Sequence, residues 1–424
     1  MKVAVVGHGM AGARIARELG RRGTDVVVFG AESHGAYNRV LLSGLLAGRH
    51  AESDIALPVP PANVELRLGE PVEAVDLDVK RVNGVGFDKL VLACGAEAVV
   101  PPIAGLDPLP PKAHVFRTLG DAREVVKGSE GCDSAIVLGG GLLGLEAARG
   151  LAGRGLDVVV VHAAGHLMER QLDPGCAGVL AETYAELGVR TIVDATTMRV
   201  ISDGGGLRLE LADGRTARGE LLVVSCGVRP NTALAKAAGL RARRGIVVDD
   251  ACRTSHPDVF AVGDCAEHDG IVHGLVGPAW EQADVVVDVL SGADPEARYT
   301  GSRLVTRLKA SGVDLAAMGR LDGPEVVTFS DPSRGTCARL VIDGDRLAGA
   351  VMVGDNPTVG RVVQLYDAGD PVPRDRRSLL MGRFEDAEAG SAVSSESVAD
   401  DAVVCRCNDV TKRRLAEAHA AGAR

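Results

Sequence analysis

Residues 7–12 read Gly7-His8-Gly9-Met10-Ala11-Gly12 and directly follow the apolar run Lys2–Val6. A short strand that leads into G-x-G-x-x-G and then into a helix is typical of a dinucleotide-binding βαβ unit. The first glycine permits the tight turn, the second lets a pyrophosphate approach the backbone, and the third lets the helix pack on the strand. Glu32 stands about 20 residues further on, where an acid contacts ribose hydroxyls. A glycine turn without a ligand is the alternative, but strand, helix and acid together favour a dinucleotide site.

The same pattern returns at Gly139-Gly140-Gly141-Leu142-Leu143-Gly144, after the apolar run Ala135–Leu138. At the end of the next strand an acid would favour NADH and an arginine NADPH, but this position holds His162. His162 favours neither NADH nor NADPH, and it can equally well be interpreted as a solvent-facing residue at a strand end. Glu146, in the first turns of the following helix, is either an acid stabilised by the helix dipole or a contact to the nicotinamide.

Short apolar runs alternate with stretches of helical spacing along this part of the chain. The alternation predicts an α/β fold with two dinucleotide-binding domains built on parallel sheets. The expected strands are Lys2–Val6, Asp25–Phe29, Leu90–Ala93, Ser134–Leu138, Asp157–Val161 and Leu221–Ser225, and the expected helices include Ala11–Arg21 and Leu142–Arg154. Near Tyr299 the pattern changes to strand-like segments such as Val326–Phe329 and Ala338–Ile342, which predict a smaller α+β domain.

The composition is that of a soluble globular protein, with 46% hydrophobic and 25% charged residues among 424. A net charge of -10 argues against a nucleic acid or an anionic membrane as the main partner. No apolar run approaches the roughly 18 to 20 residues of a membrane span, and the N-terminus does not resemble a signal peptide, so we expect a cytoplasmic protein. Seven cysteines are scattered singly along the sequence, and their spacing indicates no disulfide framework.

A third segment, Thr254–Asp264, resembles the second FAD signature of the pyridine-nucleotide-disulfide oxidoreductase superfamily. The resemblance implies a strand over Phe260–Val262 that ends in Gly263 and Asp264, with Asp264 bonded to the ribityl chain of FAD. A plain strand-end acid is the alternative. Two further segments are similar to the crossovers between the FAD and NAD domains: Leu90–Ala96 with Pro101–Gly105, and Cys226–Asn231.

This resemblance implies FAD at the first glycine turn and NADH or NADPH at the second. FAD would lie against Gly7, Gly9, Met10, Ala11, Gly12, Glu32, Arg39, Ser43, Ala93, Gly95, Gly263, Asp264 and Gln282. NAD(P)H would lie against Gly139, Gly141, Leu142, Leu143, Gly144, Glu146, His162 and Gly227. The expected organisation is an FAD-binding domain at 1–111 and 245–298, an NAD(P)H-binding domain at 112–244, a small α+β domain at 299–383, a flexible acidic linker at 384–402 and the start of a 2Fe–2S module at 403–424.

Four other segments resemble a narrower group, formed by the large subunit of NAD(P)H-dependent nitrite reductase and the electron-transfer subunit of assimilatory nitrate reductase. They are Tyr37–Ser43, Leu167–Asp173, Leu308–Ala316 and Gly349–Asp355. Rubredoxin and ferredoxin reductases are the nearest relatives outside this group.

Residues 35–50, where disulfide reductases carry a redox-active cysteine pair, contain no cysteine. Electrons therefore cannot leave through a dithiol at that position, and another acceptor is needed. The resemblance implies hydride transfer from the nicotinamide to the flavin, with the protein supplying position and electrostatics. A helix expected near Gly277–Gln282, with Pro278 in its first turn, would point its N-terminus at the flavin and stabilise negative charge on its reduced form. An ordinary structural helix is the alternative.

The C-terminal run Cys405–Thr411 resembles the opening of a bacterioferritin-associated-ferredoxin-like 2Fe–2S module. Such a cluster needs four ligands, and Cys405 and Cys407 supply only two. A zinc site meets the same objection. We therefore expect a longer parent chain that carries the missing cysteines after Arg424, the alternative being a vestigial pair.

The expected function is an FAD-dependent NAD(P)H oxidoreductase that passes electrons to an iron–sulfur or other redox centre in nitrite or nitrate assimilation. A rubredoxin- or ferredoxin-reductase-like enzyme and an NAD(P)H oxidase are alternatives, and a flavin-bearing redox sensor or scaffold is the alternative of another class. The expected partners are NAD(P)H and a downstream redox centre or acceptor protein, with a homodimer as one expected assembly. The sequence has no siroheme or 4Fe–4S cysteine pattern, so this chain alone should not reduce nitrite.

Overall fold

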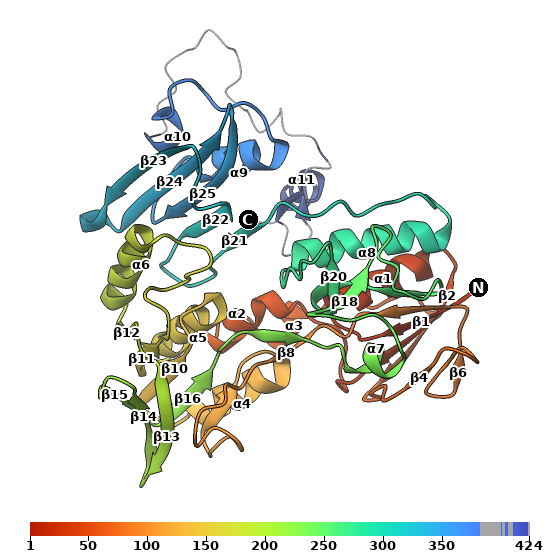
Figure 1. Ribbon diagram of the computed structural model, residues 1–424, viewed down its shortest axis with the longest axis horizontal. Coiled ribbons are helices and arrows are strands. Elements are labelled where there is room, and N and C mark those ends of the chain that lie inside the picture. The colour runs from red at the N-terminus through yellow and green to blue at the C-terminus, as the bar shows by residue number, and fades with distance from the viewer. Residues whose placement is uncertain (382–399, 401–402, 406–409, 423–424) are drawn as a thin grey trace.

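The computed structural model describes residues 1–381, 400, 403–405 and 410–422. Three five-stranded sheets dominate the chain, each with its own helices (Figure 1). This arrangement confirms the predicted α/β fold with a small C-terminal domain. Apart from Asp400, the linker expected at 384–402 lies outside the described residues, as does Cys407.

The first sheet is parallel, with strand order β19-β7-β1-β2-β3. Its strands are β1 (Lys2–Val6), β2 (Asp25–Gly30), β3 (Val64–Leu68), β7 (Lys89–Leu92) and β19 (Val259–Ala261). The valine- and leucine-rich runs of the central strands are buried on both faces, as parallel strands between helices require. Helix α1 (Met10–Arg21) packs along α8 (Val276–Ser291), so the chain returns to this sheet after completing the second one.

The second sheet is also parallel, with strand order β12-β11-β10-β16-β9. Its strands are β9 (Ala113–Val115), β10 (Ser134–Leu138), β11 (Asp157–Val161), β12 (Val189–Ile192) and β16 (Leu221–Val224). Its helices are α4 (Leu119–Ser129), α5 (Leu142–Gly153) and α6 (Pro174–Glu186). The strands and helices predicted for the two parallel sheets agree with the observed bounds to within one residue at each end.

The third sheet is antiparallel, with strand order β21-β22-β25-β24-β23. Its strands are β21 (Val305–Arg307), β22 (Leu315–Gly319), β23 (Glu325–Asp331), β24 (Thr336–Asp343) and β25 (Arg346–Val353). Helix α9 (Val359–Ala368) packs against β25 and β22. The C-terminal segment adds β26 (Val403–Cys405), β27 (Val410–Thr411) and α11 (Lys412–Ala420). No helix within the described residues combines the length and apolarity needed to cross a membrane.

Two short strands join the halves of the molecule. Strand β8 (Ala96–Ala98) leads from the first sheet to the second, and β17 (Val228–Pro230) leads back. They pair antiparallel, with Ala98 opposite Val228, so the outgoing and returning chain segments run side by side. This pairing brings the carboxyl ends of both parallel sheets toward each other.

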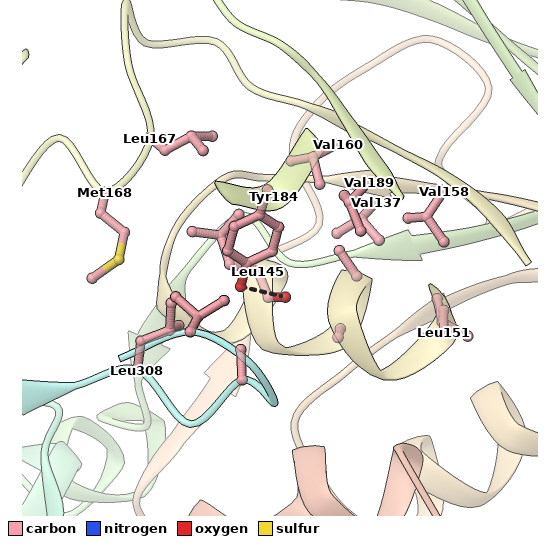
Figure 2. Packing of buried hydrophobic residues seen from close by; sticks show 14 of the residues in the cluster. Val137, Leu145, Leu151, Val158, Val160, Leu167, Met168, Tyr184, Val189 and Leu308 are labelled. Atoms are coloured by element: carbon pink, nitrogen blue, oxygen red, sulfur yellow. Dashed lines mark hydrogen bonds between the residues drawn. The ribbon is translucent and has the colours of Figure 1, made fainter. Parts of the chain in front are cut away.

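The second and third sheets share one hydrophobic core (Figure 2). Tyr184 on α6 is fully buried, and its hydroxyl donates a hydrogen bond to the Leu145 carbonyl oxygen at 3.1 Å. Leu308, from the loop after β21, belongs to the same cluster, as do Leu167 and Met168 from the loop after β11. The third sheet is therefore packed directly onto α6 and onto the loop that follows β11.

A disulfide reinforces this contact. Cys176 on α6 and Cys337 on β24 are bonded, with Cα atoms 5.4 Å apart, and both residues are buried. The expectation of singly scattered, unpaired cysteines is wrong for these two. Their sequence separation of 161 residues hides a contact that arises only from tertiary packing.

Candidate functional site

The first glycine turn leaves no room for side chains where strand, turn and helix meet. Gly7 has φ +107°, and an added Cβ would lie 2.2 Å from the Ala93 carbonyl oxygen. A Cβ on Gly12 would lie 1.9 Å from the Gly7 carbonyl oxygen. At Gly9, by contrast, a Cβ would meet no described atom within 4 Å. Gly9 is also the N-cap of α1 and supplies no side-chain cap, so the first-turn N–H groups are available to an anion.

The second glycine turn repeats this geometry closely. Gly139 has φ +117°, and an added Cβ would lie 2.2 Å from the Ser225 carbonyl oxygen. A Cβ on Gly144 would lie 2.0 Å from the Gly139 carbonyl oxygen, whereas the space around Gly141 is open among the described atoms. Gly141 is the N-cap of α5 and again provides no side-chain cap. Each turn therefore offers an open glycine and a helix N-terminus to a phosphate group.

A single cavity of about 650 Å³ lies between the two turns. This volume is in the range of roughly 300–1,000 Å³ that is usual for small-molecule sites. Both turns contribute to its wall, and the third sheet adds Arg303–Arg307 and Lys309. Val404 and Cys405 of the C-terminal segment complete the wall. Groups from all three sheets thus face one space.

The cavity brings together most of the residues predicted to contact the cofactors. The predicted FAD contacts in its wall are Gly7, Gly9, Met10, Ala11, Glu32, Arg39, Ala93, Gly95, Gly263 and Asp264. The predicted NAD(P)H contacts in its wall are Gly141, Leu142, Leu143, Glu146 and Gly227. The other predicted residues are not part of the wall: Gly12, Ser43, Gln282, Gly139, Gly144 and His162.

Glu32 lies at the predicted ribose position of the first turn and is held by three neighbours. Tyr37 Oη donates to Glu32 Oε2 at 3.0 Å, Arg39 Nη2 donates to Oε1 at 3.3 Å, and His34 Nε2 lies 3.3 Å from Oε2. Tyr37 Oη also accepts the Leu119 N–H at 2.9 Å. Burial raises the pKa of Tyr37 to about 12, so its hydroxyl remains a donor to Glu32 at neutral pH.

Asp264 lies in the turn three residues after the end of β19 and forms an ion pair with Arg117. The neighbouring Gly263 has φ +74° and donates its N–H to the Oε1 atom of buried Gln282 at 2.7 Å, which fixes this loop against α8. Arg117 was not among the predicted site residues. Its position directly before Thr118, the N-cap of α4, was the only available signal.

The N-terminus of α8 also faces the cavity. The helix begins at Val276, one residue before its expected start, and Val276, Gly277 and Pro278 line the cavity wall. Its N-cap residue, Leu275, has no side chain that can cap the first turn. The positive end of this helix therefore points at the space between the two turns.

Glu146 and Lys309 meet where the second and third sheets face the cavity. Glu146 is 6% exposed, and its Oε1 atom accepts the Lys309 backbone N–H at 2.9 Å. Burial raises the pKa of Glu146, with the N–H of Lys309 acting in the opposite direction. The Lys309 Nζ atom is buried without a hydrogen-bond partner among the described residues. A buried ammonium group is costly unless an acceptor is supplied, so Lys309 marks a place for a polar ligand group.

His162 lies at the end of β11, against the second glycine turn. The Gly140 N–H donates to His162 Nδ1 at 3.1 Å, and His162 Nε2 lies 3.0 Å from Glu169 Oε2. His162 is only 9% exposed, so the interpretation of a solvent-facing strand end is wrong. Glu169 was not among the predicted site residues, although it lies within the segment Leu167–Asp173 that carries the family resemblance.

The free thiols near the cavity do not replace the missing redox pair. Cys94 lines the cavity, and a hydrogen bond with Cys265 together with burial raises the pKa of Cys94, which keeps it a thiol. Because the thiolate is the reactive form, Cys94 is a poor nucleophile. In the part of the chain that the structure describes, no group of three His, Cys, Asp or Glu side chains could hold a metal ion.

The residues present fit two dinucleotides that meet in one cavity. Each turn offers uncapped helix N–H groups to a pyrophosphate, and each has an acid beside it. The orphaned Lys309 Nζ lies between the two turns, in the cavity wall. This arrangement can bind both nucleotides and hold their reactive rings together.

Comparison with known proteins agrees with this geometry. A family model described as pyridine nucleotide-disulphide oxidoreductase matches residues 1–287, and one described as rubredoxin NAD+ reductase C-terminal domain matches residues 305–365. Among solved structures, the covalent putidaredoxin reductase–putidaredoxin complex superposes with a TM-score of 0.80 at 24% identity, covering 89% of this chain and 95% of that chain. At this identity the likeness shows the fold alone.

Two curated relatives come from Bacillus subtilis (strain 168). Its NAD(P)H nitrite reductase is 34% identical over 432 residues, covering 98% of this chain and 53% of the relative. Its assimilatory nitrate reductase electron transfer subunit is 32% identical over 432 residues, covering 98% of this chain and 55% of the relative. The chain thus spans about half the length of these relatives.

Proposed function

The chain belongs to the pyridine nucleotide-disulphide oxidoreductase family and is an NAD(P)H-dependent flavoprotein oxidoreductase; from this premise we propose that it sends electrons from NAD(P)H through FAD to a separate redox centre in nitrite or nitrate assimilation. The observation that carries the proposal is the single cavity lined by both glycine turns, the third sheet and the C-terminal segment. FAD would occupy the first turn and NAD(P)H the second.

The chain's own residues would bind and orient the two nucleotides. The helix N-termini at Gly9 and Gly141 hold the pyrophosphates, and Glu32 accepts hydrogen bonds from the ribose of the first nucleotide. When bound, FAD supplies the acceptor and the dihydronicotinamide supplies the hydride. The protein contributes by bringing the two rings together in one cavity, which removes most of the entropic cost of their encounter.

Positive charge in the cavity would favour electron transfer toward the flavin. Lys309 Nζ has no acceptor among the described residues, and the N-terminus of α8 points into the same space. Both stabilise the negative charge that a flavin gains on reduction. Lys309, in the loop after β21, is held beside the cavity by the hydrogen bond from its backbone N–H to Glu146 on α5.

Two observations favour an exit to a separate redox centre. Residues 35–50 contain no cysteine. The hydrogen bond between Cys94 and Cys265 raises the pKa of Cys94 and lowers that of Cys265, but Cys265 is fully buried and does not line the described part of the cavity, so this pair is not exposed there as a dithiol. Cys405 lies in the cavity wall, which supports an exit through the C-terminal segment. The relatives are about twice as long as this chain and are named for nitrite and nitrate reduction, which favours those pathways.

Anaerobic mixing tests the proposal. NADH or NADPH should bleach the flavin of the purified protein, and the reduced protein should then be re-oxidised rapidly by a 2Fe–2S ferredoxin, slowly by oxygen and not at all by nitrite alone. Absence of bleaching would contradict the oxidoreductase assignment and favour a redox sensor. Re-oxidation by oxygen as fast as by the ferredoxin would favour an NAD(P)H oxidase.

A rubredoxin-reductase-like function is the second candidate. It is favoured by the match of residues 305–365 to the rubredoxin reductase C-terminal domain. The same mixing experiment distinguishes the two, because a rubredoxin would then re-oxidise the protein faster than any 2Fe–2S protein.

A further inference from the structure

We infer that this chain selects NADH over NADPH, and that Glu169, held against the second glycine turn by His162, is the residue that makes the selection. The inference rests on the proposed function, since it concerns the nucleotide that the second turn binds. In a dinucleotide fold, an acid that accepts the ribose 2′-hydroxyl favours NADH, and an arginine that meets the 2′-phosphate favours NADPH. Here the strand-end position carries His162, and the acid comes from seven residues further along the chain.

The hydrogen bonds of His162 fix its charge. Its Nδ1 atom accepts the Gly140 N–H at 3.1 Å, which requires a lone pair on Nδ1. The remaining proton is then on Nε2, which donates to Glu169 Oε2 at 3.0 Å. His162 is therefore a neutral imidazole, and it offers no positive charge to a 2′-phosphate.

The segment that carries Glu169 is fixed in place. The Met168 N–H donates to the Gly140 carbonyl oxygen at 3.0 Å, so this segment and the glycine turn are joined by backbone as well as by His162. Leu167 and Met168 are buried in the core shared by the second and third sheets (Figure 2). The Glu169 side chain remains 38% exposed, so its second oxygen can reach a ligand. A carboxylate is thus held beside the turn that would bind the pyrophosphate.

Charge at this end of the site opposes a phosphate. With His162 neutral, the His162–Glu169 pair carries one negative charge, whereas a 2′-phosphate adds nearly two more. Asp194 lies beside the loop that carries Glu169, at the rim of the second turn's site, since its N–H donates to the Ala164 carbonyl oxygen at 2.9 Å. Arg215 also reaches this rim, but its guanidinium is engaged by Asp213 and by the Asp194 carbonyl oxygen. Arg170 directly follows Glu169 and is exposed. The experiment must therefore distinguish the effect of the Arg170 charge on nucleotide preference from that of Glu169.

The test compares kcat/KM for NADH and NADPH with an artificial electron acceptor. The wild-type protein should favour NADH by about tenfold or more, the discrimination expected of one like-charge contact near a surface. Glu169→Gln should lower kcat/KM for NADH, raise it for NADPH and bring the ratio near one. Glu186→Gln, which neutralises an exposed carboxylate on α6, and Arg170→Gln should leave the ratio unchanged.

Binding of ADP-ribose and its 2′-phosphate, measured by calorimetry, gives a readout that needs no turnover. Wild type should bind ADP-ribose more tightly, and Glu169→Gln should bind both alike. The inference is overturned if wild type prefers the 2′-phosphate, if Glu169→Gln keeps the wild-type ratio, or if Arg170→Gln alone changes it. A protein that discriminates between these ligands but shows no flavin bleaching would support the inference while contradicting the proposed function.

Discussion

The two glycine turns have nearly the same backbone but different surroundings at the ribose end. At the first turn, Glu32 lies in the cavity wall and is bonded by Tyr37 and Arg39. At the second, His162 and Glu169 lie outside the cavity wall, and Glu169 is partly exposed. The shared backbone explains how both turns can bind a pyrophosphate. The difference favours a first nucleotide that stays bound and a second that enters and leaves.

The largest expected effect comes from filling the open glycine of each turn. Gly9→Val and Gly141→Val should both fold, because an added Cβ meets no described atom within 4 Å at either position. Gly9→Val should be purified without FAD and without activity, since the side chain would occupy the pyrophosphate position. Gly141→Val should keep its FAD but raise the KM for NADH about tenfold or more. Absorption spectra and steady-state kinetics check both results.

Exchanged outcomes for these two variants would contradict the assignment of FAD to the first turn and NADH to the second. Loss of FAD in Gly141→Val, with FAD retained in Gly9→Val, would assign the flavin to the second turn. Equal loss of FAD in both variants would mean that the two turns do not act separately.

Lys309→Met should have the next largest effect. It removes a buried ammonium group that has no hydrogen-bond acceptor among the described residues and that attracts the Glu146 carboxylate, so the protein without nucleotides should lose little stability. Flavin reduction by NADH should slow by about a hundredfold, as for the loss of one preorganised electrostatic contact. Stopped-flow reduction and thermal unfolding measure the two effects.

Lys236→Met is the matched control, because Lys236 is an exposed lysine on α7 (Ala233–Ala237). It should change neither measurement. If the flavin of Lys309→Met were reduced at the wild-type rate, Lys309 would not contribute to flavin reduction, and its burial would have no functional explanation.

The sequence predicted the local features of this site and missed those that depend on distant contacts. Both turns, with Asp264 after its strand, are encoded in short stretches whose glycines and strand residues act on their neighbours. Lys309 reaches Glu146 across 163 positions of the sequence. Arg117 meets Asp264 across 147. Such contacts follow from how the sheets pack on one another, which residue spacing does not reveal.

The disulfide should matter for stability more than for nucleotide binding. It closes a loop of about 160 residues between the second and third sheets, and removing it through Cys176→Ala with Cys337→Ala should lower the unfolding free energy by about 2–5 kcal/mol. FAD content should stay unchanged. Urea unfolding with and without reductant measures the change, and thiol titration of the denatured protein tests for the bond. If the denatured, unreduced wild-type protein showed the thiols of Cys176 and Cys337 in addition to those of the other cysteines, the disulfide would be contradicted.

The smallest expected effect is the pH dependence carried by Glu146. Burial raises its folded-state pKa above the ordinary value of 4.5, so the folded chain holds this proton more tightly than the unfolded chain. The resulting stability is fully present below pH 4.5 and is lost as pH rises through the folded-state pKa. Glu146→Gln should reduce this loss, by less than the effect of the disulfide. Unfolding curves at several pH values measure it, and an unchanged slope would contradict the assignment.

We propose that nucleotides bound at the two turns exchange a hydride directly within one cavity. Anaerobic flavin bleaching by NADH deuterated at C4, in either of its two stereochemical forms, tests it most directly. A rigid site presents one face of the nicotinamide to the flavin, so bleaching should be slower with only one form, and that deuterium should be absent from the NAD+ produced. Equal bleaching rates with the two forms, or deuterium retained in the NAD+ produced from each of them, would contradict direct hydride transfer.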